Sequence, residues 1–146
     1  MLPQKTRYAL RALLHLAEAP AGRPVQAQEI ATLQKVPRKY LELILLDLKH
    51  AGFVSSRRGP GGGYVLAKPA SAISFADVIR VTDGAIALVP CASEQFYARC
   101  DDCHDEASCA IRRVMVKVRE DTLATLGHTS LADAASFELV AAPLQA

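Results

Sequence analysis

The sequence predicts a mainly α-helical protein with one small β-hairpin and a long helix on the C-terminal side. Three observations support this fold class. Apolar residues recur every three or four positions in several segments, as on the buried face of a helix. Two short β-prone runs flank the glycine- and proline-rich stretch 59–63, as in a hairpin. The stretch 85–108 has no helical period and contains all four cysteines, which indicates a loop.

The composition is that of a chain that buries a core. Of its 146 residues, 51% are hydrophobic and 22% are charged, which argues against disorder. No apolar run approaches the roughly 20 residues that a membrane-spanning helix needs. The apolar N-terminal stretch contains Arg7 and Arg11, so it fits an amphipathic helix better than a signal peptide. We expect a cytoplasmic protein that does not contact membranes.

The first predicted helix spans 4–19. Its buried stripe consists of Leu10, Leu13, Leu14 and Ala17. Pro20 and the glycine and proline that follow end this helix. A short second helix is predicted over 26–33, with Gln26 as a poor N-cap because glutamine is not among the favoured capping residues.

A third helix follows after a tight turn. Pro37 suits the first helical position, where its missing N–H costs nothing, and Gly52 ends the helix. The predicted buried face consists of Leu41, Ile44, Leu45 and Leu48. Two short helices joined by a tight turn, the second with a cationic N-terminus, form a helix-turn-helix pattern.

The hairpin comes directly after this pair of helices. Arg57 and Arg58 lie at its base, and Gly61 and Gly62 lie in its tip. Glycines let a backbone approach a partner closely, and an arginine beside them can enter a narrow minor groove. The alternative is a mobile surface loop that contacts nothing. A helix-turn-helix followed by a basic hairpin is the order of elements in a winged helix.

Two further helices have clear start signals. Ser74 is predicted to cap a helix from Phe75 to about Thr82, with Asp77 completing a capping-box variant. A long helix is predicted from residue 109 or 110 to 126, on the period of its apolar residues. Ser130 is predicted to cap a last short helix that contains Leu131, followed by a frayed tail from residue 141.

We expect three parts in the chain. Residues 1–84 form the winged-helix domain, residues 85–108 form the cysteine-bearing loop, and residues 109–146 form a dimerisation helix and a C-terminal tail. The stripe on the long helix consists of Ile111, Val114, Met115, Val118, Thr122 and Leu126. Because an isolated helix with such a stripe needs a partner, we expect a homodimer.

The charges divide unevenly between the two halves of the chain. Residues 1–69 hold eleven Lys and Arg against four Asp and Glu, whereas residues 70–146 hold six against eleven. A basic half is expected of a surface that binds nucleic-acid phosphates. An ordinary solvated basic face would explain the same asymmetry, so charge alone leaves both interpretations open.

The third helix carries the candidate base-reading residues. Arg38 and Lys39 in its first turn can reach phosphates or guanine edges, and Glu42 can accept a hydrogen bond from cytosine N4. Cations oppose the helix dipole at an N-terminus, so their placement there points to an external anionic partner. The alternative is an ordinary exposed face. Our hypothesis is a double-stranded DNA operator as the partner.

The cysteines are spaced as Cys91-x8-Cys100-x2-Cys103-x5-Cys109. Thiolates are preferred ligands of iron–sulfur clusters and zinc, and all four cysteines are candidate metal ligands. The spacing does not match a standard zinc finger. Neighbouring acids would raise the thiol pKa values unless a cation is bound, which favours a metal over reactive thiols.

Several motifs resemble one known family. The segments TRYALRALLHLA, QKVPRKYLELILLDLKHAG, RGPGGGYVLAKP and ISFADVIRVTDG are similar to the bacterial Rrf2 family of winged-helix transcription regulators, of the IscR and NsrR type. The likeness covers about residues 3–135. It implies a homodimeric repressor or activator, with the helix-turn-helix in the major groove and the wing in the minor groove. It further implies that Glu42 and Arg58 read DNA, and that Cys91, Cys103 and Cys109 hold an iron–sulfur cluster.

The chain departs from the family pattern around the cysteines. The interval between Cys91 and Cys103 is long, Cys100 is additional, and Arg112 stands where some members place a histidine ligand. A [2Fe–2S] or [4Fe–4S] cluster, a zinc site and a thiol–disulfide switch therefore all remain open. An enzyme such as a small thiol oxidoreductase is the rival class. It is disfavoured because the CxxC lies in an acidic loop and does not open a helix after a strand.

Overall fold

The computed structural model describes residues 2–140, and the expected tail from residue 141 lies outside the described residues. Its main elements are α1 (Gln4–Glu18), α2 (Ala27–Gln34), α3 (Arg38–His50), β1 (Val54–Arg57), β2 (Gly63–Leu66), α4 (Phe75–Thr82), α5 (Ala110–His128) and α6 (Leu131–Val140), with short 3-10 turns η1 (Ala70–Ala72) and η2 (Pro90–Ala92). The predicted mainly helical fold with a hairpin and a long C-terminal helix is confirmed. No described helix is both long and apolar enough to cross a bilayer.

One hydrophobic core holds α1, α2, α3 and the base of the hairpin together. The largest fully buried apolar side chains are Leu13, Ile30, Leu41, Ile44, Leu45, Leu48, Ile73, Leu131, Val25, Val54 and Val78. Each such side chain contributes about 1.5–3 kcal/mol relative to full exposure. Leu131 of α6 belongs to this core, and its N–H donates to Ile73 O at 2.9 Å. The chain therefore returns to the winged domain after α5.

The helix-turn-helix is formed as predicted, with one correction. Pro37 was expected at the first helical position, but its ψ of 124° places it outside α3 as the N-cap. The first helical hydrogen bond runs from Leu41 N to Pro37 O at 2.9 Å. Proline is tolerated at either position because neither needs its N–H. Gly52, with φ of +77°, ends the helix as expected.

The hairpin is a two-stranded antiparallel ribbon anchored to the chain before α2. Val54 pairs with Leu66 and Arg57 pairs with Gly63. Tyr64 exchanges two backbone hydrogen bonds with Val25, at 2.8 and 2.9 Å. Gly63 has φ of +149°, and a Cβ there would lie 2.5 Å from Val25 O. Only glycine allows this close backbone contact, which fixes the wing against the helical domain.

The predicted start signals of α4 and α6 are confirmed. Ser74 Oγ accepts from Asp77 N at 3.1 Å, and the Asp77 carboxylate accepts in return from Ser74 N. Ser130 and Asp133 form the same reciprocal pair at the start of α6. In each helix, this reciprocal pair gives a hydrogen-bond partner to two backbone N–H groups at the helix start, which have none within the helix.

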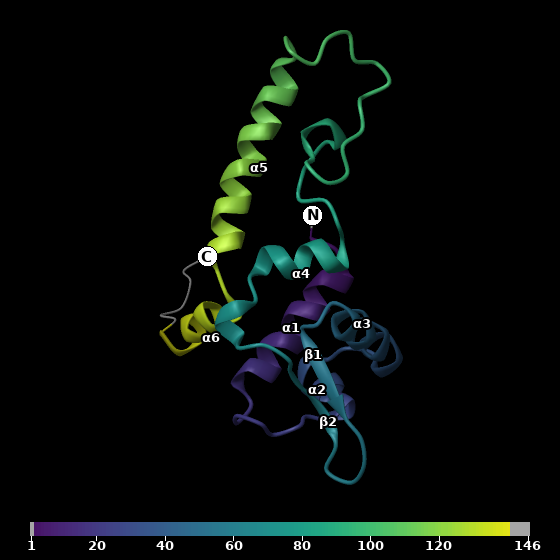
Figure 1. The fold of residues 1–146 in the computed structure, drawn as a ribbon, viewed down its shortest axis with the longest axis vertical. Helices are drawn as coiled ribbons and strands as arrows, with labels where there is room; N and C mark the ends of the chain where they lie inside the picture. The colour runs from purple at the N-terminus through teal and green to yellow at the C-terminus, as the bar shows by residue number, and fades with distance from the viewer. Residues whose placement is uncertain (1, 141–146) are drawn as a thin grey trace.

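Helix α5 rises away from the winged domain and runs beside the loop 85–108, which turns over at the far end (Figure 1). None of the 19 residues of α5 is buried. Ile111, Val114 and Val118 of the predicted stripe are 67%, 56% and 36% exposed. The long helix therefore presents an apolar face that the single chain leaves open.

Candidate nucleic-acid interface and cysteine site

The winged domain has a cleft of about 460 Å³ between the starts of α2 and α3 and the wing. Its lining consists of Gln26, Ala27, Gln28, Arg38, Arg57, Gly59, Gly62 and Gly63. The fold thus brings together Arg38, Arg57 and Gly62, which the sequence had placed on two separate elements. Gln26 gives α2 no side-chain cap, so the helix start in this cleft keeps free N–H donors, as expected of a poor N-cap.

The exposed start of α3 carries Arg38, Lys39 and Glu42. Arg38 Nε donates to Glu42 Oε1 at 3.0 Å, and Arg38 Nη1 donates to Gln28 Oε1 at 3.2 Å. The Arg38–Glu42 pair is half-exposed at both ends, so it stabilises α3 by only about 0.3–0.5 kcal/mol. Both side chains therefore exchange this contact for another partner at little cost.

The wing tip is an ordered turn. Gly62 N donates to Gly59 O at 2.9 Å, and Gly61 has φ of +75°. Proline at the second position and a left-handed glycine at the third are the signature of a type II turn. A Cβ at Gly62 would lie 2.3 Å from Arg57 O, so the chain folds tightly against its own strand there. The tip is therefore a closed type II turn, and its contact with DNA stays a prediction.

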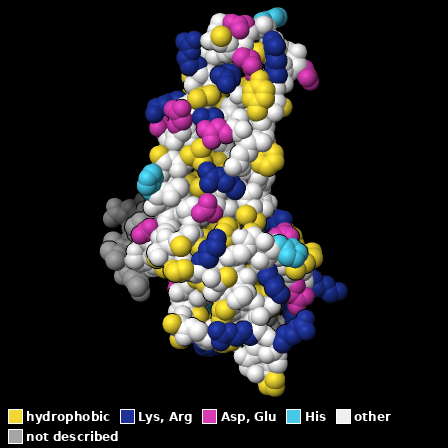
Figure 2. All heavy atoms as spheres, viewed as in Figure 1, with side chains coloured by type: hydrophobic (Ala, Val, Ile, Leu, Met, Phe, Trp, Pro, Cys, Tyr) yellow, Lys and Arg dark blue, Asp and Glu magenta, His cyan; other side chains and the backbone are white. Residues whose placement is uncertain are grey.

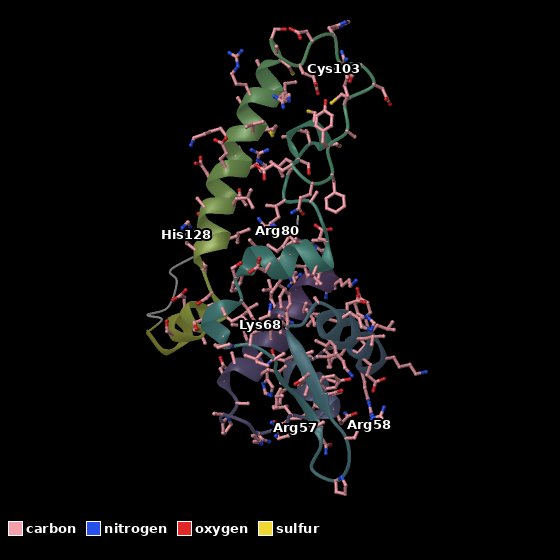
Figure 3. All side chains as sticks on the ribbon, in the orientation of Figure 1. Arg57, Arg58, Lys68, Arg80, Cys103 and His128 are labelled. Carbon is pink, nitrogen blue, oxygen red and sulfur yellow. The ribbon has the colours of Figure 1, made fainter. Side chains whose placement is uncertain are left out.

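The two wing arginines differ in their contacts. Arg57 Nη1 donates to Gly22 O at 3.1 Å, which ties the wing to the turn after α1. Arg58 is exposed and makes no hydrogen bond or ion pair with any described residue. Figure 3 shows both side chains at the wing, at the end of the molecule opposite Cys103. Arg58 is therefore the arginine that is free to contact an external anion.

Charge follows this division of the molecule. On the face drawn in Figure 2, Lys and Arg side chains lie over both halves of the molecule, whereas most Asp and Glu side chains lie on the half that holds α5 and the cysteine loop, so the winged domain carries the excess of positive charge. The basic front half predicted from the sequence thus becomes one end of the folded chain. Such an end attracts polyanions over a distance of about 8–10 Å at physiological salt.

All four cysteines line one cavity of about 410 Å³ at the other end of the molecule. Each is a free thiol. Cys91 lies on η2 and is only 6% exposed, and its Sγ lies 3.8 Å from Cys100 Sγ. Among residues 2–140, no three His, Cys, Asp or Glu side chains converge closely enough to hold one metal ion. Cys91 and Cys100 are thus in contact, and Cys103 and Cys109 line the same cavity.

The contact with Cys91 raises the pKa of the Cys100 thiol, and burial and the charges of Cys91 and Asp102 raise it further. The predicted direction of the shift is confirmed for this cysteine. The main cause is the neighbouring thiol, however, and the acids contribute less. A thiol with a raised pKa is a weak nucleophile at neutral pH unless a cation stabilises its thiolate.

Short local turns place the other two cysteines. Cys103 N donates to Cys100 O at 3.2 Å, which closes the CxxC segment into a turn. Asp105 accepts from Ala107 N and Ser108 N, and contacts with Ser108 and then Ala107 lower the Asp105 pKa. Immediately afterwards Cys109 caps α5, with its Sγ accepting from Arg112 N at 3.4 Å. The cysteine cavity therefore continues directly into the first turn of α5.

Two arginines of α5 hold η2 in place. Arg112 Nε donates to Cys91 O at 3.1 Å, and Arg119 Nη1 donates to Ala92 O at 2.7 Å. The Arg119 side chain is 13% exposed, and it also pairs with Glu94 at 3.2 Å. We call Arg112 and Arg119 the arginine clasp. It joins the segment that carries Cys91 to the long helix.

A family model described as "Iron-dependent Transcriptional regulator", Rrf2, matches residues 2–136. The chain belongs to the Rrf2 family. It is a DNA-binding transcription regulator and not an enzyme, so the thiol oxidoreductase alternative is excluded. It is 46% identical over 136 residues to the putative rrf2-like HTH-type transcriptional regulator of Rhodobacter capsulatus. The aligned region covers 91% of each of the two chains.

Solved structures similar to the chain include two named regulators, CymR and IscR. CymR, the global cysteine regulator of B. subtilis, is 31% identical with a TM-score of 0.78 and covers 94% of this chain and 97% of its own. T. potens IscR is 27% identical with a TM-score of 0.76 and covers 100% of this chain and 93% of its own. An oxidised form of Staphylococcus aureus CymR is 26% identical with a TM-score of 0.71, covering 92% and 95%.

Sequence reasoning missed the clasp in this Rrf2 protein. Arg112 was noted only as standing in place of a histidine, and Arg119 was not singled out. Residues seven apart lie on one face of a helix, two turns from each other, so the spacing itself was a signal. What the sequence could not indicate was the acceptor, because η2 lies 21 residues before Arg112 in a loop without a period.

Proposed function

We propose that this Rrf2 regulator binds its operator as a homodimer, and that an iron–sulfur cluster held in the cysteine cavity controls its affinity for DNA. The observation that carries this proposal is that all four cysteines line one cavity whose last member, Cys109, caps α5. The family description as iron-dependent and the likeness to IscR support it. A cluster bound there would supply a group that gains and loses electrons and is lost under oxidation.

On the DNA side, the roles of the winged-domain residues follow from their exposure and charge. Arg38, Lys39 and Glu42 enter the major groove at the start of α3, once the Arg38–Glu42 pair opens. Arg57 and Arg58, with the glycine tip 59–63, approach the minor groove. Gly61 and Gly62 let the wing backbone lie close to a phosphate, because no side chain intervenes.

Dimerisation through α5 would link the cysteine loop to the two winged domains. Ile111, Val114 and Val118 form an open apolar stripe on α5, and a second copy of α5 would bury it. In such a dimer, the two copies of α3 would contact DNA half-sites about one or two helical turns apart. Any shift of α5 relative to the winged domains changes that spacing and therefore the affinity.

Ligand binding to the cysteine cavity would act on α5 through its first turn and through the clasp. Three or four thiolates that share one group order the loop 91–109, so binding free energy becomes ordering free energy. The clasp joins this loop to α5 at Cys91 and Ala92. A tenfold change in operator affinity requires only about 1.4 kcal/mol of coupling.

The test compares holo protein, apo protein and the Cys103→Ala variant. The protein is purified without oxygen, its absorption spectrum and its iron and sulfide content are measured, and an operator is selected from a random duplex pool. We expect a brown protein whose holo and apo forms differ at least tenfold in operator affinity at fixed salt, with Cys103→Ala behaving as the apo form. Agreement of all three within twofold would refute cluster control and leave DNA binding intact.

A thiol–disulfide switch is the second candidate, because Cys91 Sγ and Cys100 Sγ are within 3.8 Å. A peroxide would take two electrons and two protons from the two thiols, which yields the disulfide and two water molecules, or water and an alcohol. Zinc is the third candidate, and a colourless protein with one zinc per chain would support it. Metal analysis and disulfide mapping of the same preparation separate the three.

A further inference from the structure

The distance between the Cys91 and Cys100 sulfur atoms has a specific meaning for metal binding. The two Sγ atoms lie 3.8 Å apart, although the residues are nine positions apart in the loop. A tetrahedral metal with metal–sulfur bonds of about 2.3 Å holds any two of its sulfur ligands about 3.8 Å apart. The pair therefore already has the separation of two ligands on one metal atom.

We propose that Cys91 and Cys100 chelate the same metal atom, so that the additional cysteine is a ligand and completes an all-cysteine site. This inference rests on the proposed function and deepens it. Arg112 does not serve as the fourth ligand, because its Nε donates to Cys91 O and a guanidinium stays protonated in proteins. Apart from Arg112, His104 is the one cavity-lining residue with a side-chain nitrogen, so it is the competing ligand.

The backbone on both sides of the pair is held before any metal arrives. The clasp fixes the carbonyls of Cys91 and Ala92, and Ala98 N donates to Pro90 O at 3.4 Å, which draws the two ends of the segment together. On the other side, the turn from Cys100 to Cys103 is closed by its own hydrogen bond. Sites held this way lose little entropy when the metal binds.

The pairing also selects a cluster type. In a [2Fe–2S] cluster each iron carries two protein ligands, whereas in a cubane [4Fe–4S] cluster each cysteine binds a different iron. Cys91 and Cys100 sharing one iron leaves Cys103 and Cys109 for the second iron. We therefore expect a [2Fe–2S] cluster with four thiolate ligands.

The first experiment reconstitutes the full-length chain with ferrous iron and sulfide without oxygen, and counts bound atoms by native mass spectrometry. We expect two irons and two sulfides in the wild type and in His104→Ala, and loss of the cluster in Cys100→Ala. Cys100→Ser, which keeps an oxygen ligand, is expected to retain some cluster with a shifted electron paramagnetic resonance signal after reduction. Far-ultraviolet circular dichroism and a cooperative thermal unfolding transition check that each variant is folded.

Several results would overturn the inference. These are a Cys100→Ala variant that keeps the full cluster and an unchanged resonance signal, a His104→Ala variant that loses the cluster, and a wild type that holds four irons. Any of these rejects the shared iron while leaving a cluster-controlled regulator in place.

The second experiment uses Co²⁺ alone and keeps the test valid if no cluster assembles. Sulfur-to-cobalt charge-transfer absorption of the apo protein should fall in Cys91→Ala and in Cys100→Ala and stay unchanged in His104→Ala. Absence of iron from every preparation defeats the proposed function, and the cobalt result then decides the shared metal atom independently. A mapped Cys91–Cys100 disulfide in protein that binds neither iron nor cobalt overturns both in favour of the thiol switch.

Discussion

The winged domain and the part of the chain that projects from it are built in different ways. We call residues 85–128, which comprise the cysteine loop and α5, the arm. The domain has a core in which Leu41, Ile44 and Leu45 are fully buried. In the arm, no residue of α5 is buried, and the loop is held by hydrogen bonds from arginines to carbonyls. The domain supplies its own stability, whereas the arm depends on partners.

This difference separates two tasks. The residues proposed to contact DNA lie on a domain with its own buried core, so we expect their positions to change little with conditions. The arm has few buried apolar contacts, which is the property of segments that open or rearrange at low free-energy cost. A sensor needs such a segment, because a ligand shifts only an equilibrium between states of similar stability. The wing tip and the loop that carries the cysteines lie at opposite ends of the molecule (Figure 1).

The largest expected effect tests the core of the winged domain. Leu45→Ala removes a fully buried side chain and leaves a cavity, so the free energy of unfolding should fall by about 2–5 kcal/mol. Val118→Ala on the open stripe of the arm should lower it by less than about 1 kcal/mol when the protein is monomeric. Urea titrations at one dilute protein concentration measure both. Equal losses at the two positions would contradict the division into a stable domain and a dependent arm.

The next effect concerns the partner of the arm. Val118→Glu places a charge within the apolar stripe, and burying an unpaired carboxylate against a second α5 is costly. We expect the dimer dissociation constant to rise at least tenfold, with operator affinity falling because one half-site is lost. Sedimentation velocity at micromolar concentration gives the measurement. Ala124→Glu, at an exposed position on the face of the same helix opposite the stripe, is the matched control. A monomeric wild type would contradict the dimer itself.

Local signals were enough to predict most of the domain. The helical period located α1 and α3, the Ser74–Asp77 capping box located the start of α4, and Gly52 located the end of α3. The start of α3 was displaced by one residue because Pro37 is compatible with both the N-cap and the first helical position. Each of these features depends on a few residues that are neighbours in the sequence, so each can be predicted from the sequence alone.

The arm was predictable in its chemistry and not in its geometry. Four cysteines in one loop indicated a shared site, and the fold does bring them to one cavity. The family pattern had implied Cys91, Cys103 and Cys109 as ligands and left Cys100 as additional, whereas Cys100 Sγ lies 3.8 Å from Cys91 Sγ. In a loop without a period, such pairing depends on distant hydrogen bonds like that from Arg112 to Cys91 O. No local rule predicts these contacts.

A third prediction separates two DNA contacts within the domain. Glu42→Ala should relax discrimination at one base position by about 1–3 kcal/mol, because a carboxylate that accepts from cytosine is lost. Arg58→Ala should weaken binding to all sequences and reduce the salt dependence by about one unit of slope. Fluorescence titrations over several salt concentrations, with single-base operator variants, measure both. Indistinguishable profiles for the two variants would mean that their roles were assigned wrongly.

The smallest expected effect tests how the arm communicates with the domain. Arg119→Gln removes the cationic donor to Ala92 O and the pair with Glu94, while Cys91, Cys100, Cys103 and Cys109 are untouched. We expect the variant to bind iron and sulfide as the wild type does. Its holo and apo forms should differ by no more than about twofold in operator affinity, in place of about tenfold, because α5 no longer follows η2.

The control for this experiment is Arg113→Gln on the same turn of α5 as Arg112. Arg113 donates to Ala107 O at 3.2 Å, so it also contacts the loop, but it does not touch η2. If the clasp transmits the state of the cavity, Arg113→Gln keeps the full holo-to-apo ratio and Arg119→Gln loses it. If both variants keep the ratio, the change in the cavity reaches α5 through Cys109 alone, because Cys109 is where the chain passes from the loop into α5. If both lose it, coupling depends on the order of the whole loop, and the arm responds as one unit.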